Sequence, residues 1–586
     1  MKLSTAALLV AVMTACVTTG SQAELSLETV APADAVGVMA IKDLGGVVTK
    51  LSDTELLRTE DREALNAYIR TALNGQDGAI SEVWKALFEN QDPVEVMSSI
   101  SAGLAMWVDS TDASASVLTV AVWIDLGEDA KGIGEAWDTT WETLRAEPRL
   151  KSETVLGRSV DHIAQGSVAG DRPNPIPNDT WVVREASRLL FSNTQSGMMR
   201  LLDAVDGEVF DDTLGDTEHW SAVKEMLDGP DAFVAAGFIH PMFQAVGLMD
   251  SMGMVPMIQG SFDAAVGPVR AMAVSAGPGD GDDLLSWSAA IWMPEGQGGL
   301  LRLFSHNTPR ESLPGWVGPD TSAVSRLNID FRRIPDWIRS VIASNPMLVG
   351  MGQMVDQSEE LMRSILNPLG RRILQVQTVT RPLTSTSIAS VAAIECTNPT
   401  GLSDALAATA PQADMEPRDF QGHQVWSTEL SGMGMMPLPG LEGAISMSVA
   451  GGHLLAGDES AVESALRGLA TRSSSPPAWL ERVTSWLPDT PLSAWGGWDL
   501  AESLTAVAEI QRLQFKKWEE ELKADDPELW EEIKSELVDE NQAEQDDRAA
   551  AIARHLGPAA WWGSSADDGF RIRGVVMGAT SPHESR

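Results

Sequence analysis

Apolar residues are grouped into short runs, and these runs recur in the same order in the two halves of the chain. The runs 116–124 and 387–395 are rich in β-branched residues, as is typical of buried strands. The matched segments are, in order, 30–44 with 317–331, 116–124 with 387–395, 155–160 with 420–425, 188–196 with 452–460, 230–231 with 488–489, and 266–268 with 556–558. The recurrence predicts one scaffold present twice.

Strand-like runs are joined by turn residues, as in the glycine- and aspartate-rich segment 277–283, so the sheets are predicted to be largely antiparallel. Two strands run into helical stretches, and Thr194 and Asp458 occupy the N-cap positions there. We therefore predict an α+β fold in two tandem copies, 25–300 and 310–580, with helices covering one face of each sheet.

The second copy carries an acidic insert at 501–550. Its segment 501–537 has helical periodicity that is interrupted at Asp525-Asp526-Pro527, where an aspartate cap and a first-turn proline restart the helix. The insert is predicted to be a helical hairpin with a solvated acidic outer face and an apolar inner face.

The N-terminus, 1–23, reads as a signal peptide: Lys2 is followed by a short apolar run and by small residues up to Ala23. The alternative is a lipoprotein signal with Cys16 as the lipidated residue. Either predicts export to the periplasm, the cell envelope or the medium. No other apolar run is long enough to span a bilayer, so no transmembrane segment is expected.

The charge balance limits the partners. With 42 basic and 83 acidic residues the chain has a net charge of −41, which disfavours binding to nucleic acid or anionic lipid. After removal of 1–23, Cys396 is the remaining cysteine, so no intramolecular disulfide is expected. Cys396 ends a strand-like run and is predicted to be a packed thiol rather than a nucleophile.

No catalytic signature stands out, and no catalytic residue, metal ligand or cofactor is assigned. The eight histidines are scattered without metal-ligand spacing. Ser221 and Lys224 match an SxxK pair, but the accompanying elements of that motif are absent. A hydrolase with an unrecognised acidic or serine-based site remains an alternative.

The distribution of the methionines is the most unusual feature of the sequence. Ten of the 25 lie in three groups: Met249, Met252, Met254 and Met257; Met347, Met351 and Met354; and Met433, Met435 and Met436. Methionine fills irregular gaps in cores, lines adaptable apolar binding surfaces, and ligates soft ions such as Cu(I). Core filling is the plainest interpretation. Among functional ones we favour an apolar groove for a lipid-like or peptide partner over a copper site.

The duplicated layout of an export signal, a proline-aspartate entry into a strand, a glycine-containing strand and a strand-to-helix block resembles secreted or envelope bacterial proteins of unknown function of the planctomycete type. That resemblance implies no catalytic residues. The sequence thus predicts an exported binding or structural protein of the cell envelope, of open oligomeric state, with a hydrophobic ligand or a protein as partner.

Overall fold

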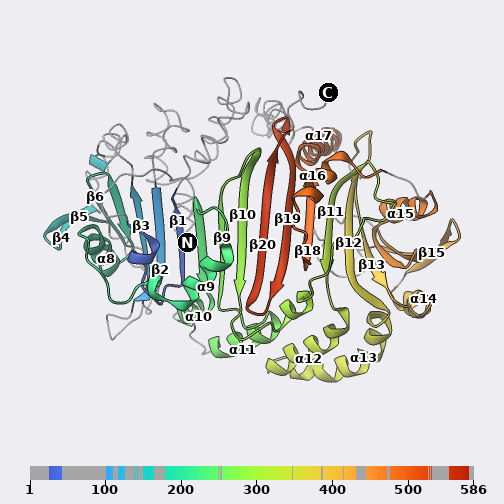
Figure 1. Cartoon of the computed structure of the whole chain (residues 1–586), viewed down its shortest axis with the longest axis horizontal. Helices are drawn as coiled ribbons and strands as arrows, with labels where there is room; N and C mark the ends of the chain where they lie inside the picture. The colour runs from blue at the N-terminus through green and yellow to red at the C-terminus, as the bar shows by residue number, and fades with distance from the viewer. Residues whose placement is uncertain are drawn as a thin grey trace. The chain divides into compact units, whose positions relative to one another are not determined.

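The structure is a computed structural model of an α+β protein (Figure 1). It describes residues 25–42, 101–109, 117–125, 138, 141–142, 150–163, 179–247, 250, 254–345, 347–384, 387–413, 415–429, 444–471, 475–525, 527, 530 and 553–579. The signal segment 1–23 with Cys16 lies outside these residues, as do Met249, Met252, Met433, Met435 and Met436.

The chain divides into two compact units. Unit 1 comprises 1–259 and 269–295, and unit 2 comprises 260–268 and 296–586. The helix α11 (Val255–Ala265) contributes to both.

Unit 1 contains ten described strands, all paired antiparallel. They are β1 (Gly37–Ile41), β2 (Ser101–Asp109), β3 (Val117–Asp125), β4 (Leu150–Val155), β5 (Arg158–Ile163), β6 (Thr180–Glu185), β7 (Arg188–Ser192), β8 (Phe233–Phe238), β9 (Ala271–Pro278) and β10 (Asp283–Trp292). Their order across the sheet is β4-β5-β6-β7-β3-β2-β1-β8-β9-β10. The adjacent strands β1 and β8, far apart in the sequence, pair Val38 with Ala236.

The described helices of unit 1 outside α11 are α2 (Leu27–Val30), α8 (Gln195–Val205), α9 (Glu218–Leu227) and α10 (Ile239–Gly247). The first three bury apolar side chains such as Val30, Leu201 and Val223 in one core with the strands. As predicted, Thr194 caps α8: its side-chain oxygen accepts a hydrogen bond from the Gly197 N–H at 3.0 Å.

Unit 2 also contains ten described antiparallel strands. They are β11 (Thr321–Asn328), β12 (Leu369–Val379), β13 (Ile388–Cys396), β14 (Glu416–Phe420), β15 (His423–Glu429), β16 (Ala444–Ala450), β17 (His453–Asp458), β18 (Ala494–Asp499), β19 (Leu556–Ala566) and β20 (Gly569–Gly578). Their order is β14-β15-β16-β17-β13-β12-β11-β18-β19-β20.

Helices lie on both faces of the unit 2 sheet, which corrects the expectation of one covered face. Along β13, Val391 and Ala393 pack in the core formed with α15 (Glu459–Thr471) and α16 (Ala478–Trp486). The neighbouring Ile394 and Cys396 pack on the other face against α14 (Pro399–Thr409). Successive strand residues point to opposite faces, so a strand that is apolar at both needs cover on each side.

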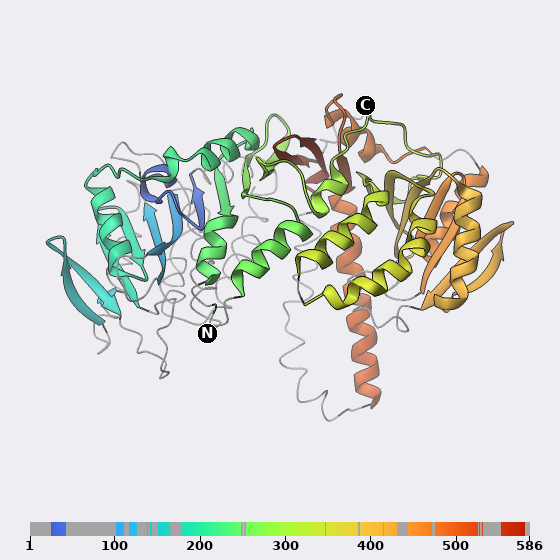
Figure 2. The ribbon, with the colours of Figure 1, turned by 90° about the horizontal axis from the view of Figure 1, so that it is seen from below.

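Two further expectations in unit 2 are corrected or only partly described. Asp458 does not cap α15 with its side chain; that carboxylate accepts a hydrogen bond from the Ser390 N–H at 2.6 Å instead. The first helix of the 501–550 insert is α17 (Leu500–Asp525), which buries Ala506 and Ile510 near its start. Figure 2 shows its later half extending away from the strands of its unit. The second half of the expected hairpin lies mostly outside the described residues.

One close approach in the unit 1 sheet yields a stability test. Gly103 of β2 lies opposite Trp123 of β3, and a Cβ at Gly103 would come within 2.0 Å of the indole ring. We expect Gly103→Ala to lower the free energy of unfolding by about 1–3 kcal/mol, because the ring must move out of a packed core. Chemical denaturation measures the change.

Gly237 of β8 is the matched control. A Cβ there would meet no atom within 4 Å, so Gly237→Ala is expected to leave stability unchanged or raise it by at most about 1 kcal/mol. Equal losses in the two variants would show that the ring contact is not what constrains Gly103.

Candidate functional site

A helical hairpin in unit 2 carries the one methionine group that the structure describes in full. Its helices are α12 (Ile334–Ser344) and α13 (Gly352–Leu366), which pack side by side (Figures 1 and 2). A short 3₁₀ turn, η5 (Val349–Met351), leads into α13. The hairpin leaves the sheet after β11 and returns to it at β12.

Four large apolar side chains on this hairpin are exposed to solvent. Met347 is 74% exposed, Met351 48%, Met354 66% and Leu361 43%. Met354 and Leu361 are two helical turns apart and so lie on one line of α13. Met351 precedes Met354 by about one turn, at the N-cap of α13, and Met347 lies in the turn that leads into η5. We call Met347, Met351, Met354 and Leu361 the methionine stripe.

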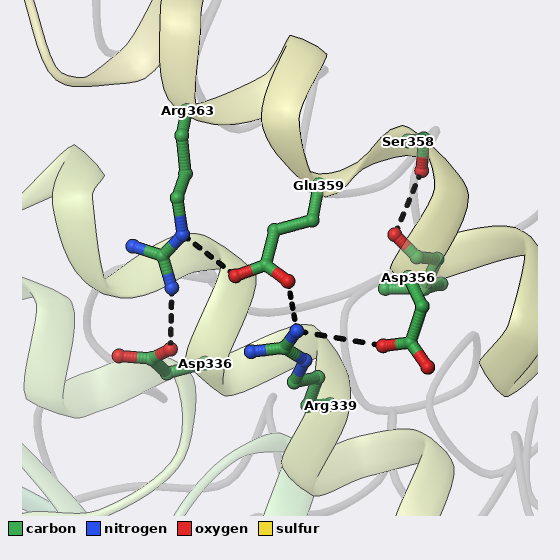
Figure 3. Close-up of polar contacts among 7 residues, drawn as sticks. Asp336, Arg339, Asp356, Ser358, Glu359 and Arg363 are labelled. Carbon is green, nitrogen blue, oxygen red and sulfur yellow. Dashed lines mark hydrogen bonds and ion pairs between the residues drawn. The ribbon is translucent and has the colours of Figure 1, made fainter.

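The opposite side of α13 carries an ion-pair network with α12 (Figure 3). Glu359 accepts hydrogen bonds from Arg363 of its own helix, at 2.7 Å, and from Arg339 of α12. Arg363 also pairs with Asp336 of α12 at 3.1 Å, and Arg339 with Asp356 at 3.4 Å. At ~100° per residue, Glu359 is about 140° around the helix from Met354. The network therefore fixes α13 with its methionine stripe facing solvent.

A buried carboxylate joins the two ends of the hairpin to the sheet. Asp330 is 4% exposed and lies just before α12. Its Oδ2 is 3.4 Å from Nε of Arg333, beside the start of α12, and 3.2 Å from Arg371, which follows α13 on β12. One carboxylate thus holds both ends of the hairpin in place.

His306 lies against this cluster, with Nε2 at 3.4 Å from Asp330 Oδ2. Burial lowers the pKa of His306 below its ordinary value, and the positive charges of Arg371 and Arg333 lower it further. Asp330 opposes the shift without reversing it. The folded protein therefore favours the neutral form of His306 more than the unfolded chain does.

Some predicted site residues lie elsewhere. Met254 and Met257, at the start of α11, are half-buried and do not belong to the methionine stripe. Leu361 and the Arg339–Glu359–Arg363 network were not identified from the sequence. The spacing of Met347, Met351, Met354 and Leu361 is the signal that could have revealed the stripe.

The SxxK pair is not arranged for catalysis. Both residues lie on α9 and are exposed, and the Lys224 Nζ is 2.9 Å from Glu28 Oε1. An ammonium in an ion pair has no lone pair with which to take the serine proton.

Cys396 is a buried thiol that donates to the Pro368 carbonyl at 3.5 Å. Burial raises the pKa of this thiol, which disfavours the nucleophilic thiolate. The prediction of a packed thiol is consistent with this environment.

Other chemistry is not apparent where the chain is described. No three His, Cys, Asp or Glu side chains in that part converge as a metal site would require. No helix of that part is both long and apolar enough to cross a membrane.

The ion-pair network predicts a local effect on stability. We expect Glu359→Gln to speed amide hydrogen exchange in α12 and α13 about fivefold, the equivalent of ~1 kcal/mol, because both arginines lose a charged acceptor. Glu360→Gln, a neighbouring exposed position, is the control and should leave exchange unchanged. Equal effects of the two variants would contradict this role for Glu359.

His306 predicts a pH dependence. Its folded pKa lies below the ordinary histidine value of 6.5, so the unfolded chain binds the proton more readily. The stability that His306 contributes is fully present above pH 6.5 and is lost as the pH falls from there through the folded pKa. We expect His306→Gln to lose less stability than the parent protein between pH 7 and pH 5, measured by denaturation at each pH. An identical pH profile in His306→Gln and in His240→Gln, a control at an exposed position of α10, would contradict this.

Comparison of the chain with protein-family models, with curated proteins and with solved structures returned no match. The functional argument therefore depends on the geometry of the site itself.

Proposed function

We propose that this protein is an exported, non-catalytic binding protein whose methionine stripe binds an amphipathic helix of a partner protein. The observation that supports this proposal is the solvent exposure of the stripe. Singly exposed apolar residues are common on protein surfaces, but four large ones within 347–361, two of them on one line of α13, are typical of an interaction surface. Three of the four are methionines, whose flexible thioethers adapt to irregular partner surfaces.

Helix stability does not account for these residues. Met351 occupies the N-cap position of α13, where its side chain makes no capping hydrogen bond and where Ser, Thr, Asp or Asn is favoured. No residue of α13 is fully buried, although Ile365 and Leu366 near its end contact the core cluster around α14. The exposed half of the helix thus contributes little to the core of unit 2.

Charge indicates the chemistry of the partner. Glu360 is exposed on α13, about 100° around the helix from Leu361, and the whole chain has a net charge of −41. A helix with an apolar stripe flanked by Lys or Arg complements both features, whereas an anionic lipid surface is repelled. We therefore favour a cationic amphipathic helix over a lipid.

We also propose that the two units are copies of one ancestral fold. The support is the strand order. When the ten described strands of each unit are numbered from its own first strand, both follow the order 4-5-6-7-3-2-1-8-9-10. The recurrence of the sequence blocks supports the same proposal.

A labelled synthetic helix tests the binding proposal. The peptide carries leucines at heptad spacing flanked by lysines, and fluorescence anisotropy measures its binding to the full chain. We expect Met354→Glu and Leu361→Glu each to weaken binding at least about tenfold, because each places a charge in the apolar contact. The affinity should also fall as salt is added.

Met272→Glu is the matched control, since Met272 is an exposed methionine of β9 in unit 1. It should leave the affinity unchanged. Equal binding of a glutamate-flanked peptide, or parent-like binding by both stripe variants, would reject the proposed partner.

A further inference from the structure

A cavity of about 280 Å³ in unit 1 lies apart from the hairpin and has its own chemistry. It is lined by residues of α2, the end of β1, α9 with the turn that follows it, and strands β8 and β9. Its volume equals that of about nine waters at ~30 Å³ each, which is the size of a small organic molecule.

Part of the cavity wall is apolar. Leu27, Leu227 and Val234 are buried side chains that line it, together with the buried Trp220. Water in contact with such a wall loses hydrogen bonds, so a ligand that covers it with an aliphatic side chain gains free energy.

The remaining wall carries two ion pairs. Lys42 Nζ is 2.9 Å from Asp231 Oδ2, and Lys224 Nζ is 2.9 Å from Glu28 Oε1. Both lysine side chains are about half exposed, and an ammonium has three donors, so each can contact a ligand while keeping its carboxylate.

Lys42 and Lys224 both affect the pKa of the Glu28 carboxylate. Burial alone would raise the pKa of Glu28, but the hydrogen bond and charge of Lys224, together with the charge of Lys42, hold that pKa below its ordinary value. The positive field of both ammonium groups therefore reaches the Glu28 carboxylate.

The charged side chains that line the cavity indicate which class of ligand it can bind. Two lysines face three carboxylates, those of Glu28, Asp228 and Asp231. A simple anion is opposed by these carboxylates and by the net charge of −41, and a simple cation is opposed by the lysines. A zwitterion meets both signs.

We propose that this cavity binds a small zwitterion with an aliphatic side chain, of the α-amino acid class. Its carboxylate contacts the Lys42 and Lys224 ammonium groups, its ammonium contacts the acidic side chains, and its side chain covers Leu27, Leu227 and Val234. The site is independent of the partner helix proposed for the hairpin.

Isothermal titration of the full chain with L-leucine and L-methionine tests this. Three analogues separate the contributions: N-acetyl-leucine lacks the positive charge, leucinamide lacks the negative charge, and glycine lacks the side chain. We expect leucine or methionine to bind and each analogue to bind at least about tenfold weaker. No heat with either amino acid at millimolar concentration, or equal binding of the analogues, overturns the proposal.

Lys42→Met and Lys224→Met are expected to weaken binding at least about tenfold. Lys151→Met, at an exposed position of β4, is the control and should bind as the parent does. Thermal melts check folding. If Lys224→Met unfolds because Glu28 loses its partner, Lys42→Met still decides the question, since it leaves that ion pair intact. Parent-like binding by a folded Lys42→Met variant overturns the proposal.

Discussion

The ion pairs of the buried Asp330 are the interaction on which the arrangement of the hairpin depends. A carboxylate removed from water is costly unless charged donors surround it, and here the donors flank the hairpin at its two ends, Arg333 and Arg371. The Arg333 pair is local, whereas the Arg371 pair forms only when the chain returns to the sheet after α13. The Glu359 network then orients α13, and the methionine stripe is exposed as a result.

This arrangement separates the side of the hairpin that stabilises it from the side that is available for binding. Charged side chains between the helices provide directional contacts, whereas the apolar contacts of a methionine tolerate many partner shapes. A surface of this kind suits recognition rather than catalysis. Catalysis requires a nucleophile or base held in place and shielded from water, and the methionine and leucine side chains of the stripe provide neither.

Much of the fold could be predicted from local sequence patterns. The β-branched run 387–395 is a strand, and Thr194 caps a helix, because both features depend on neighbours in the chain. Contacts between distant residues could not be foreseen. Asp458 has the composition of an N-cap, yet its side chain is bound by Ser390 of a different strand. Likewise nothing near Asp330 in the sequence indicates Arg371 as its partner, and the cavity in unit 1 assembles from five separate segments.

The strand order has a kinetic consequence. In unit 1 the pairing of Val38 with Ala236 joins residues far apart in the chain, as does the pairing of Val324 with Gly497 in unit 2. These strands cannot pair until most of their unit has been synthesised. Such distant pairings also slow folding, because the chain loses loop entropy before the contacts form. If the chain is exported, as proposed, late folding keeps it in the unfolded state that a translocation channel accepts.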